Sequence, residues 1–171
     1  ITFRRNNVDG QVGRRANPGV GPVSGLRHGR NARLERGGWI MHLVVDVGNT
    51  ETVIGLFAPN SLEVLADRRY ATVIPRTSDE LLLLIRTLLQ DAGHSLEGVD
   101  RTVLGSVVPV QTEILLRTLA SVGTGDVFVL DGEEGLPVRL DVEEPPQGVG
   151  PDRIANTLAA AHLYQRDTIV V

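Results

Sequence analysis

The sequence contains neither cysteine nor lysine, and only 4% of its residues are aromatic. Without cysteine the chain has no disulfide, no thiolate metal ligand and no cysteine nucleophile, which fits the reducing cytoplasm where we expect this protein. Without lysine, every permanently positive side chain is an arginine, whose guanidinium is no general base but binds carboxylates and phosphates through two hydrogen bonds. No apolar run approaches the ~20 residues of a membrane helix, so no membrane span is predicted.

The remaining composition is that of a globular protein, with 42% hydrophobic and 22% charged residues among 171. This length suits one ordinary domain, or one domain and a piece of another. The charge is unevenly distributed, because residues 1–40 hold eight Arg against Asp9 and Glu35, whereas residues 41–171 hold nine Arg against nineteen acids. The acidic second segment offers no basic groove for nucleic acid. The four histidines show no spacing typical of metal ligands: His28, His42, His94 and His162.

Residues 1–40 are rich in Gly, Arg, Asn and Pro and show no helical or strand periodicity, so we predict that they are disordered. They begin without Met and end just before Met41, the only methionine. A basic nucleic-acid arm would carry aromatic residues beyond Phe3 and Trp39, and a transit peptide would carry more Ser and an amphipathic stripe. We therefore favour a non-native leader upstream of a start at Met41 over these two alternatives.

Three consecutive β-type runs predict an antiparallel meander of strands over 42–47, 52–58 and 63–73. Thr77 and Glu80 then have the spacing of a capping box, which predicts a helix over 81–90. Strand and helix alternate beyond it, which favours a parallel portion of sheet with crossover helices. The expected elements there are strand 102–106, helix 111–120, strand 126–130, a short strand 138–140, a helix from Gly150-Pro151 to Tyr164 and a strand from Asp167. The predicted fold class is therefore α/β with a mixed sheet.

The run from His42 to Val53 has the form of a strand, a small polar turn and a second strand. Asp46 lies where the first strand would emerge from the sheet, and Gly48 permits a tight turn and a close approach of a ligand to the backbone. Asn49 and Thr50 add short hydrogen-bonding side chains, so the turn has the parts of a phosphate cradle. A plain β-hairpin, in which Asp46 binds the turn backbone, explains the same residues equally well.

The later helix opens with Gly150-Pro151-Asp152-Arg153, with Pro151 at its first position. The helix dipole favours an acid in the first turn by roughly 0.3 to 1 kcal/mol, so Asp152 has a purely structural explanation. Arg153 lies at the end of the dipole that disfavours a cation, which suggests an anionic partner near Asp152 or in a ligand. The predicted inward stripe of this helix is Ile154, Leu158 and Ala161.

Four motifs appear in a characteristic order and spacing: Asp46-Val47-Gly48-Asn49-Thr50, Thr77-Ser78-Asp79-Glu80-Leu81, Ser106-Val107-Val108-Pro109 and Gly150-Pro151-Asp152-Arg153-Ile154-Ala155-Asn156. From about Met41 to the last residue they resemble type III pantothenate kinase. That family belongs with actin, hexokinase and the chaperone ATPases, built from two ribonuclease H-like α/β halves around ATP. The resemblance implies ATP-dependent phosphorylation of pantothenate to 4'-phosphopantothenate, the first step of coenzyme A synthesis, with Mg²⁺ and a monovalent cation, K⁺ or NH₄⁺.

The resemblance also implies roles for individual residues. The ATP phosphate tail would lie along Asp46, Val47, Gly48, Asn49, Thr50, Glu51, Thr52 and Val53, with Asp46 near the magnesium ion. Pantothenate would contact Gly150, Pro151, Asp152 and Arg153. Asp152 would be the general base that takes the proton of the pantothenate hydroxyl, and the fork of Arg153 suits the pantothenate carboxylate. The family further suggests a homodimer.

By the same resemblance, residues 41–148 form the first ribonuclease H-like domain. Residues 149–171 would be a linking helix and the first strand of a second domain that is truncated at its start. The family's second phosphate motif, which supplies the monovalent-cation ligand, would follow Val171, so we expect little or no kinase activity from these 171 residues alone. Glu143-Glu144-Pro145-Pro146 replaces the Tyr and the Asn-Pro pair that help shape the family's pantothenate pocket.

Two other functions remain open for the same residues. One is a non-catalytic accessory or regulatory protein of the same fold, which the altered loop and the missing half favour. The other is a ribonuclease H-like nuclease, which needs several carboxylates around two metals about 4 Å apart. Asp46 and Asp152 supply only two such groups, and the acidic core lacks a groove for a phosphate backbone.

Overall fold

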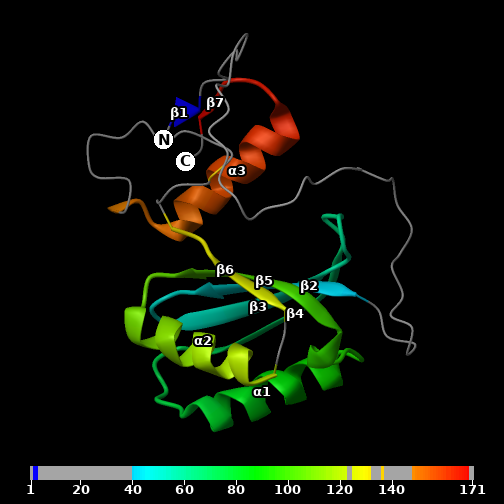
Figure 1. Ribbon diagram of the computed structural model, residues 1–171. Coiled ribbons are helices and arrows are strands. Elements are labelled where there is room, and N and C mark those ends of the chain that lie inside the picture. The colour runs from blue at the N-terminus through cyan, green and yellow to red at the C-terminus, as the bar shows by residue number, and fades with distance from the viewer. Residues whose placement is uncertain (1, 4–39, 123–124, 132–135, 137–147, 170–171) are drawn as a thin grey trace, which may run out of the picture.

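The computed structural model describes residues 2–3, 40–122, 125–131, 136 and 148–169, which are built around a mixed five-stranded sheet (Figure 1). The sheet has the order β4-β3-β2-β5-β6. Its strands are β2 Met41–Val47, β3 Glu51–Phe57, β4 Val64–Ala71, β5 Val99–Ser106 and β6 Asp126–Val129. The first three pair antiparallel, whereas β5 pairs parallel with β2, and β6 parallel with β5. Both the predicted meander and the predicted parallel portion are therefore confirmed.

Two helices, α1 (Ser78–Asp91) and α2 (Pro109–Val122), cover one face of the sheet, and α3 (Pro151–Tyr164) lies on the other side (Figure 1). The capping box of α1 is present as predicted, because the Thr77 amide donates to the Glu80 carboxylate over 2.8 Å and the Glu80 amide donates back to the Thr77 hydroxyl. The hydrogen bond from the Thr77 amide, and to a smaller extent the one from the Thr77 hydroxyl, lowers the pKa of Glu80. This α/β arrangement is the ribonuclease H-like half that the sequence predicts.

The predicted helix over 111–120 is two residues longer at each end than expected. The Ser106 hydroxyl accepts a hydrogen bond from the Val108 amide and donates to the Val108 carbonyl, which turns the chain directly into α2. Pro109 then begins the helix, where its missing N–H and fixed φ cost nothing. The Ser106-Val107-Val108-Pro109 motif is therefore both the exit of β5 and the start of α2.

The hydrophobic core lies between the sheet and the α1/α2 layer. Leu43, Val45 and Val47 alternate along β2 and are fully buried in it, so the intervening residues of β2 face the side of α3. The helices contribute Leu81, Ile85 and Leu89 from α1 and Leu115 and Leu119 from α2, with the i, i+4 spacing of amphipathic helices.

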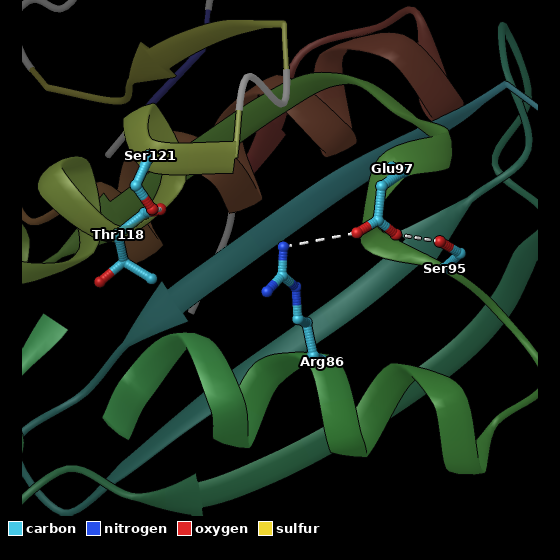
Figure 2. Close-up of polar contacts among 5 residues, drawn as sticks. All are labelled: Arg86, Ser95, Glu97, Thr118 and Ser121. Carbon is cyan, nitrogen blue, oxygen red and sulfur yellow. Dashed lines mark hydrogen bonds and ion pairs between the residues drawn. The ribbon is translucent and has the colours of Figure 1, made fainter. Parts of the chain in front are cut away.

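Polar contacts join the parts of the helical layer (Figure 2). On the edge of α1, Arg86 forms a 3.5 Å ion pair with Glu97 of the short 3-10 helix η1 (Leu96–Gly98). The Ser95 hydroxyl donates to the same carboxylate, which lowers the pKa of Glu97. Within α2, the buried Thr118 hydroxyl lies 2.8 Å from the Ile114 carbonyl and 3.3 Å from the Ser78 carbonyl at the start of α1. These contacts set the position of α1 against its neighbours.

Helix α3 has the predicted bounds, but its buried surface is wider than the predicted stripe. Ile154 is fully buried, Leu158 and Ala161 are half-buried, and the small residues Thr157 and Ala160 are buried as well. The Thr157 hydroxyl donates to the Arg153 carbonyl over 2.8 Å, which satisfies it inside the helix. Hydropathy periodicity missed these two positions because a small or hydroxylated side chain carries little apolar signal.

The strand predicted from Asp167 is described as β7 (Thr168–Ile169), which pairs antiparallel with β1 (Thr2–Phe3) rather than with the main sheet. Thr2 and Phe3 thus belong to a two-residue strand, and the interpretation of residues 1–40 as a disordered leader stays a prediction. A short β-branched segment exposes backbone donors and acceptors at its edge, and Thr2 and Phe3 pair with them. The predictions for 4–39, for the strand 138–140 and for the Glu143–Pro146 loop lie outside the described residues.

None of the helices in the described ranges has the length and apolar character that crossing a membrane requires.

Candidate active site at the carboxyl edge of the sheet

Asp46 lies on the face of β2 that points away from the helical core, one residue before the strand ends. Its register partners are Val53 on β3 and Gly105 on β5, so it stands on the central strand near the carboxyl edge of the sheet. Crevices outside the carboxyl ends of parallel strands are the usual ligand sites of α/β sheets. No hydrogen bond from Asp46 to the turn is found among the described residues, unlike in the plain-hairpin alternative.

The turn after β2 presents backbone donors beside this carboxylate. The Gly48 amide donates to the Glu51 carbonyl over 3.0 Å, and a Cβ at Gly48 would approach that same carbonyl oxygen to 3.0 Å. The amides of Asn49 and Thr50 have no partner within the described part of the chain, and both residues are exposed. Free amides on a tight glycine turn are the groups that bind phosphate oxygens.

A buried polar cluster holds this turn in place from below. The Thr72 amide donates to the Thr50 carbonyl over 2.8 Å, and the Thr72 and Thr52 hydroxyls are 2.8 Å apart. The Gln111 side chain of α2 donates to the Thr72 carbonyl over 3.3 Å. The Thr52 side chain therefore faces the core, so it meets a ligand only through its backbone.

Two further residues complete that cluster. Tyr70 is buried beside Thr52, and its hydroxyl has no well-formed hydrogen bond among the described residues. Burial raises the pKa of Tyr70, despite the opposing effects of the nearby Thr52 hydroxyl and Arg76. The Arg76 guanidinium stacks 5.3 Å above the Tyr70 ring and donates to the Ala71 carbonyl over 2.8 Å. These contacts fix the loop that follows β4 next to the turn.

Two charged residues lie on the solvent side of the turn. Glu51 begins β3, and its carboxylate lies 3.6 Å from the guanidinium of Arg69 on β4. Both side chains are more than half exposed, so this ion pair contributes little to stability. For a ligand, the relevant feature is that the positively charged Arg69 guanidinium lies at the same edge of the sheet as the turn. Val53 is half-buried and stands beside Asp46 in register.

The first turn of α3 carries Asp152 and Arg153, both exposed. The Gly150 carbonyl accepts hydrogen bonds from the Arg153 and Ile154 amides, at 3.0 and 3.2 Å, so Gly150 begins the helix. A Cβ at Gly150 would lie 2.5 Å from the Asp152 carboxylate, although the φ of −58° at Gly150 suits any residue. A side chain at residue 150 would therefore displace the Asp152 carboxylate from its present position. Arg153 forms no ion pair within the described residues.

The fold brings Asp46 and Asp152 to the same place, although about a hundred residues separate them in sequence. Gly105 is the register partner of Asp46, and a Cβ at Gly105 would lie 3.3 Å from the Pro151 Cβ. Asp46 is exposed, yet partial desolvation raises the pKa of its carboxyl, and the negative charge of Asp152 raises it further. Two carboxylates that repel each other in this way favour a cation between or beside them.

The residues at this edge could hold magnesium together with phosphate oxygens. No group of three or more acidic, His or Cys side chains suited to a metal ion is found among the described residues. Mg²⁺ in nucleotide sites usually takes one or two carboxylates and completes its shell with water and phosphate oxygens. Asp46 meets that requirement, with Asp152 close beside it, and the backbone amides of the adjacent turn suit phosphate oxygens.

The family model of type III pantothenate kinase matches residues 42–171. The chain belongs to this family. The type III pantothenate kinase of Moorella thermoacetica is 37% identical over 133 residues, covering 77% of this chain and 50% of the relative. That of Thermomicrobium roseum is 38% identical over 133 residues, covering 77% and 49%. The chain thus spans about half the length of the curated relatives it matches. The solved structure of YeaZ from Pseudomonas aeruginosa has a TM-score of 0.38 and 21% identity, covering 53% of this chain and 43% of its own.

Two residues that organise this edge of the sheet carry no sequence signal of their own. Gly105 lies inside an apolar strand, where a glycine looks like a packing detail. Thr72 lies just beyond β4 and supports the turn through both its amide and its hydroxyl. Gly105 could be identified as a glycine in an apolar strand that pairs with the carboxylate-bearing residue Asp46. This identification requires the strand order, which the sequence alone does not provide.

Proposed function

We propose that this chain carries the ATP-phosphate and pantothenate-activating half of a pantothenate kinase active site. The observation that carries the proposal is the placement of Asp46 and Asp152 at one edge of the sheet, beside a turn whose Asn49 and Thr50 amides have no partner among the described residues. Phosphoryl transfer needs little covalent help from a protein, because positioning and charge stabilisation provide most of the rate enhancement. The described residues supply groups for both purposes.

In the proposed reaction, the pantothenate hydroxyl oxygen forms a bond to the γ-phosphorus of ATP, and the bond from that phosphorus to the ADP oxygen breaks. Asp152 accepts the hydroxyl proton as general base, because it is exposed at the start of α3 within the same site. Arg153 binds the pantothenate carboxylate through two hydrogen bonds from its guanidinium. Gly150 and Pro151 shape the backbone from which these two side chains project.

The ATP phosphates bind along the turn from Asp46 to Val53, chiefly through the amides of Asn49 and Thr50. Magnesium at Asp46 would neutralise the phosphates and relieve the repulsion between the two carboxylates. The proposed reaction also uses a monovalent cation, K⁺ or NH₄⁺. We further propose the division into a domain over 41–148 and a linking segment over 149–171, a cytoplasmic location, and a homodimer.

The test is a coupled assay of ADP release with pantothenate, ATP, magnesium and potassium, on the protein produced from its whole reading frame. Asp152→Asn is expected to lower kcat by at least about 100-fold, because the amide cannot accept the proton. The matched control is Asp167→Asn, an exposed acid beyond the other end of α3, which should leave kcat unchanged. Circular dichroism and the melting temperature should not distinguish the two variants from the parent.

Two results would count against the proposal. If the parent protein releases no ADP that depends on pantothenate, the kinase function is wrong. If Asp152→Asn retains near-normal turnover, Asp152 is not the base. A third measurement uses the 171-residue chain itself, for which we expect little or no turnover because it spans about half the length of the relatives it matches.

A further inference from the structure

Gly105 on β5 lies against the first turn of α3. A Cβ at residue 105 would lie 3.3 Å from the Cβ and 3.8 Å from the Cγ of Pro151. The first of these distances is shorter than ordinary van der Waals contact between carbons, which begins near 3.5 Å. Any side chain at residue 105 therefore requires a displacement of a few tenths of an ångström.

Pro151 cannot provide that space by rotating its side chain, because the pyrrolidine ring is fixed to the backbone at both ends. The displacement must come from the start of α3 or from β5 itself. β5 is hydrogen-bonded on both sides, to β2 and β6, and Leu104 next to Gly105 is fully buried in the core. The start of α3 is the freer of the two, so it is the part that moves.

We propose that Gly105 is a positioning residue, whose missing side chain seats the first turn of α3 on β5 and so sets the placement of Asp152 relative to Asp46. Asp46 is the register partner of Gly105, and Asp152 directly follows Pro151. The contact between residues 105 and 151 therefore joins the strand that pairs with Asp46 to the helical turn that carries Asp152. The effect on catalysis rests on the proposed kinase function, whereas the packing of the first turn of α3 on Gly105 does not.

The seating matters for catalysis because a base must reach its proton while the phosphates stay bound at the turn. A misplacement of about 1 Å can cost about 100-fold in rate, so a shift of a few tenths is expected to cost about tenfold. The loss should fall mainly on kcat. The KM for ATP should change by less than about twofold, since Asn49 and Thr50 lie on a turn that α3 does not form.

The experiment compares Gly105→Ala with Gly55→Ala in the protein from the whole reading frame. Gly55 is a matched control, because it is also a strand glycine of this sheet and its Cβ would meet only the Phe57 ring, 3.1 Å away. The two readouts are kcat and KM in the ADP assay, and amide hydrogen exchange at Arg153 and Ile154. Both amides donate to the Gly150 carbonyl, so they report on the first turn without any substrate.

We expect Gly105→Ala to lower kcat about tenfold and to accelerate exchange at the two amides about threefold, whereas Gly55→Ala does neither. Adding Pro151→Gly removes the atoms that the new methyl meets, so the double variant should recover part of the lost kcat and of the lost protection. Should Gly105→Ala alone fail to fold, the same second change must restore folding.

The proposed packing of α3 on Gly105 would be wrong if amide exchange is unchanged in Gly105→Ala. It would also be wrong if Pro151→Gly has the same effect in the parent protein as in Gly105→Ala. If amide exchange changes in Gly105→Ala but kcat does not, Gly105 positions the first turn of α3 without affecting the placement of Asp152 for catalysis, and that part of the proposal is wrong. If the parent protein has no pantothenate-dependent activity, only the proposed function is wrong. The hydrogen-exchange measurement still tests whether Gly105 positions the first turn of α3.

Discussion

At the scale of single residues, the environment of Asp46 disfavours its negative charge unless a cation binds nearby. Burial and the nearby charge of Asp152 both raise the pKa of its carboxyl, so the folded, ligand-free protein disfavours the ionised form. A carboxyl with a raised pKa contributes stability that is fully present below its unfolded-state pKa and is lost as the pH rises through its folded-state pKa. The site therefore costs the ligand-free protein stability at neutral pH.

Asp46→Asn is expected to raise the free energy of unfolding of the ligand-free protein at about pH 7, because the amide carries no charge to desolvate or repel. The advantage over the parent should shrink as the pH falls, since the parent carboxyl then becomes neutral too. Urea denaturation at a series of pH values between about 7 and about 3 measures both effects.

The control for that series is Asp67→Asn, the same substitution on an exposed position of β4. We expect it to change stability by less than about 0.5 kcal/mol. An Asp46→Asn protein that is less stable than the parent at neutral pH would mean that the carboxylate forms a stabilising contact.

At the scale of elements, the sequence predicts α1 best, because several independent signals agree there. The capping box, the apolar spacing and the stop at Gly93, whose φ is +79°, all predict the same helix. Predictions for α3 are weaker on its buried side, where Thr157 and Ala160 pack without an apolar signal. The pairing of β7 with β1 was not predictable, since two-residue strands carry no periodicity.

Helix α1 also allows a matched test of which face holds the core. Leu81 is 1% exposed and Leu83 is 68% exposed, although the two leucines are two residues apart on the same helix. Leu81→Ala is expected to lower the free energy of unfolding by about 2 to 5 kcal/mol, through lost burial and a residual cavity. Leu83→Ala should cost less than about 0.5 kcal/mol, because alanine loses no packing there and favours the helix. Urea denaturation of both variants checks this, and similar costs would contradict the assigned face.

At the scale of the whole molecule, the sequence predicts the parts of the site but not how they meet. Asp46 and Asp152 each stand out within their own motif, one at a strand end and one in a first turn. Their proximity depends on the strand order, which places β5 next to β2, and on the glycine that lets α3 approach. Such contacts between distant segments are set by packing, which leaves no periodic pattern in a single sequence.

The two faces of the sheet are also expected to differ in dynamics. The core cluster contains residues of β2, β3, β5, α1 and α2, and none of the described residues of α3 belongs to it. Helix α3 meets the sheet mainly at β5, where Gly105 provides no side chain to pack. Segments with few shared apolar contacts open without global unfolding, so the amides of residues 157–161 should exchange with hydrogen faster than the Val45 and Leu104 amides by at least about tenfold. Exchange measured by NMR in urea below the unfolding transition tests this. Equal opening free energies on both faces would instead show that α3 unfolds together with the sheet, and that it contributes to the core as an integral layer.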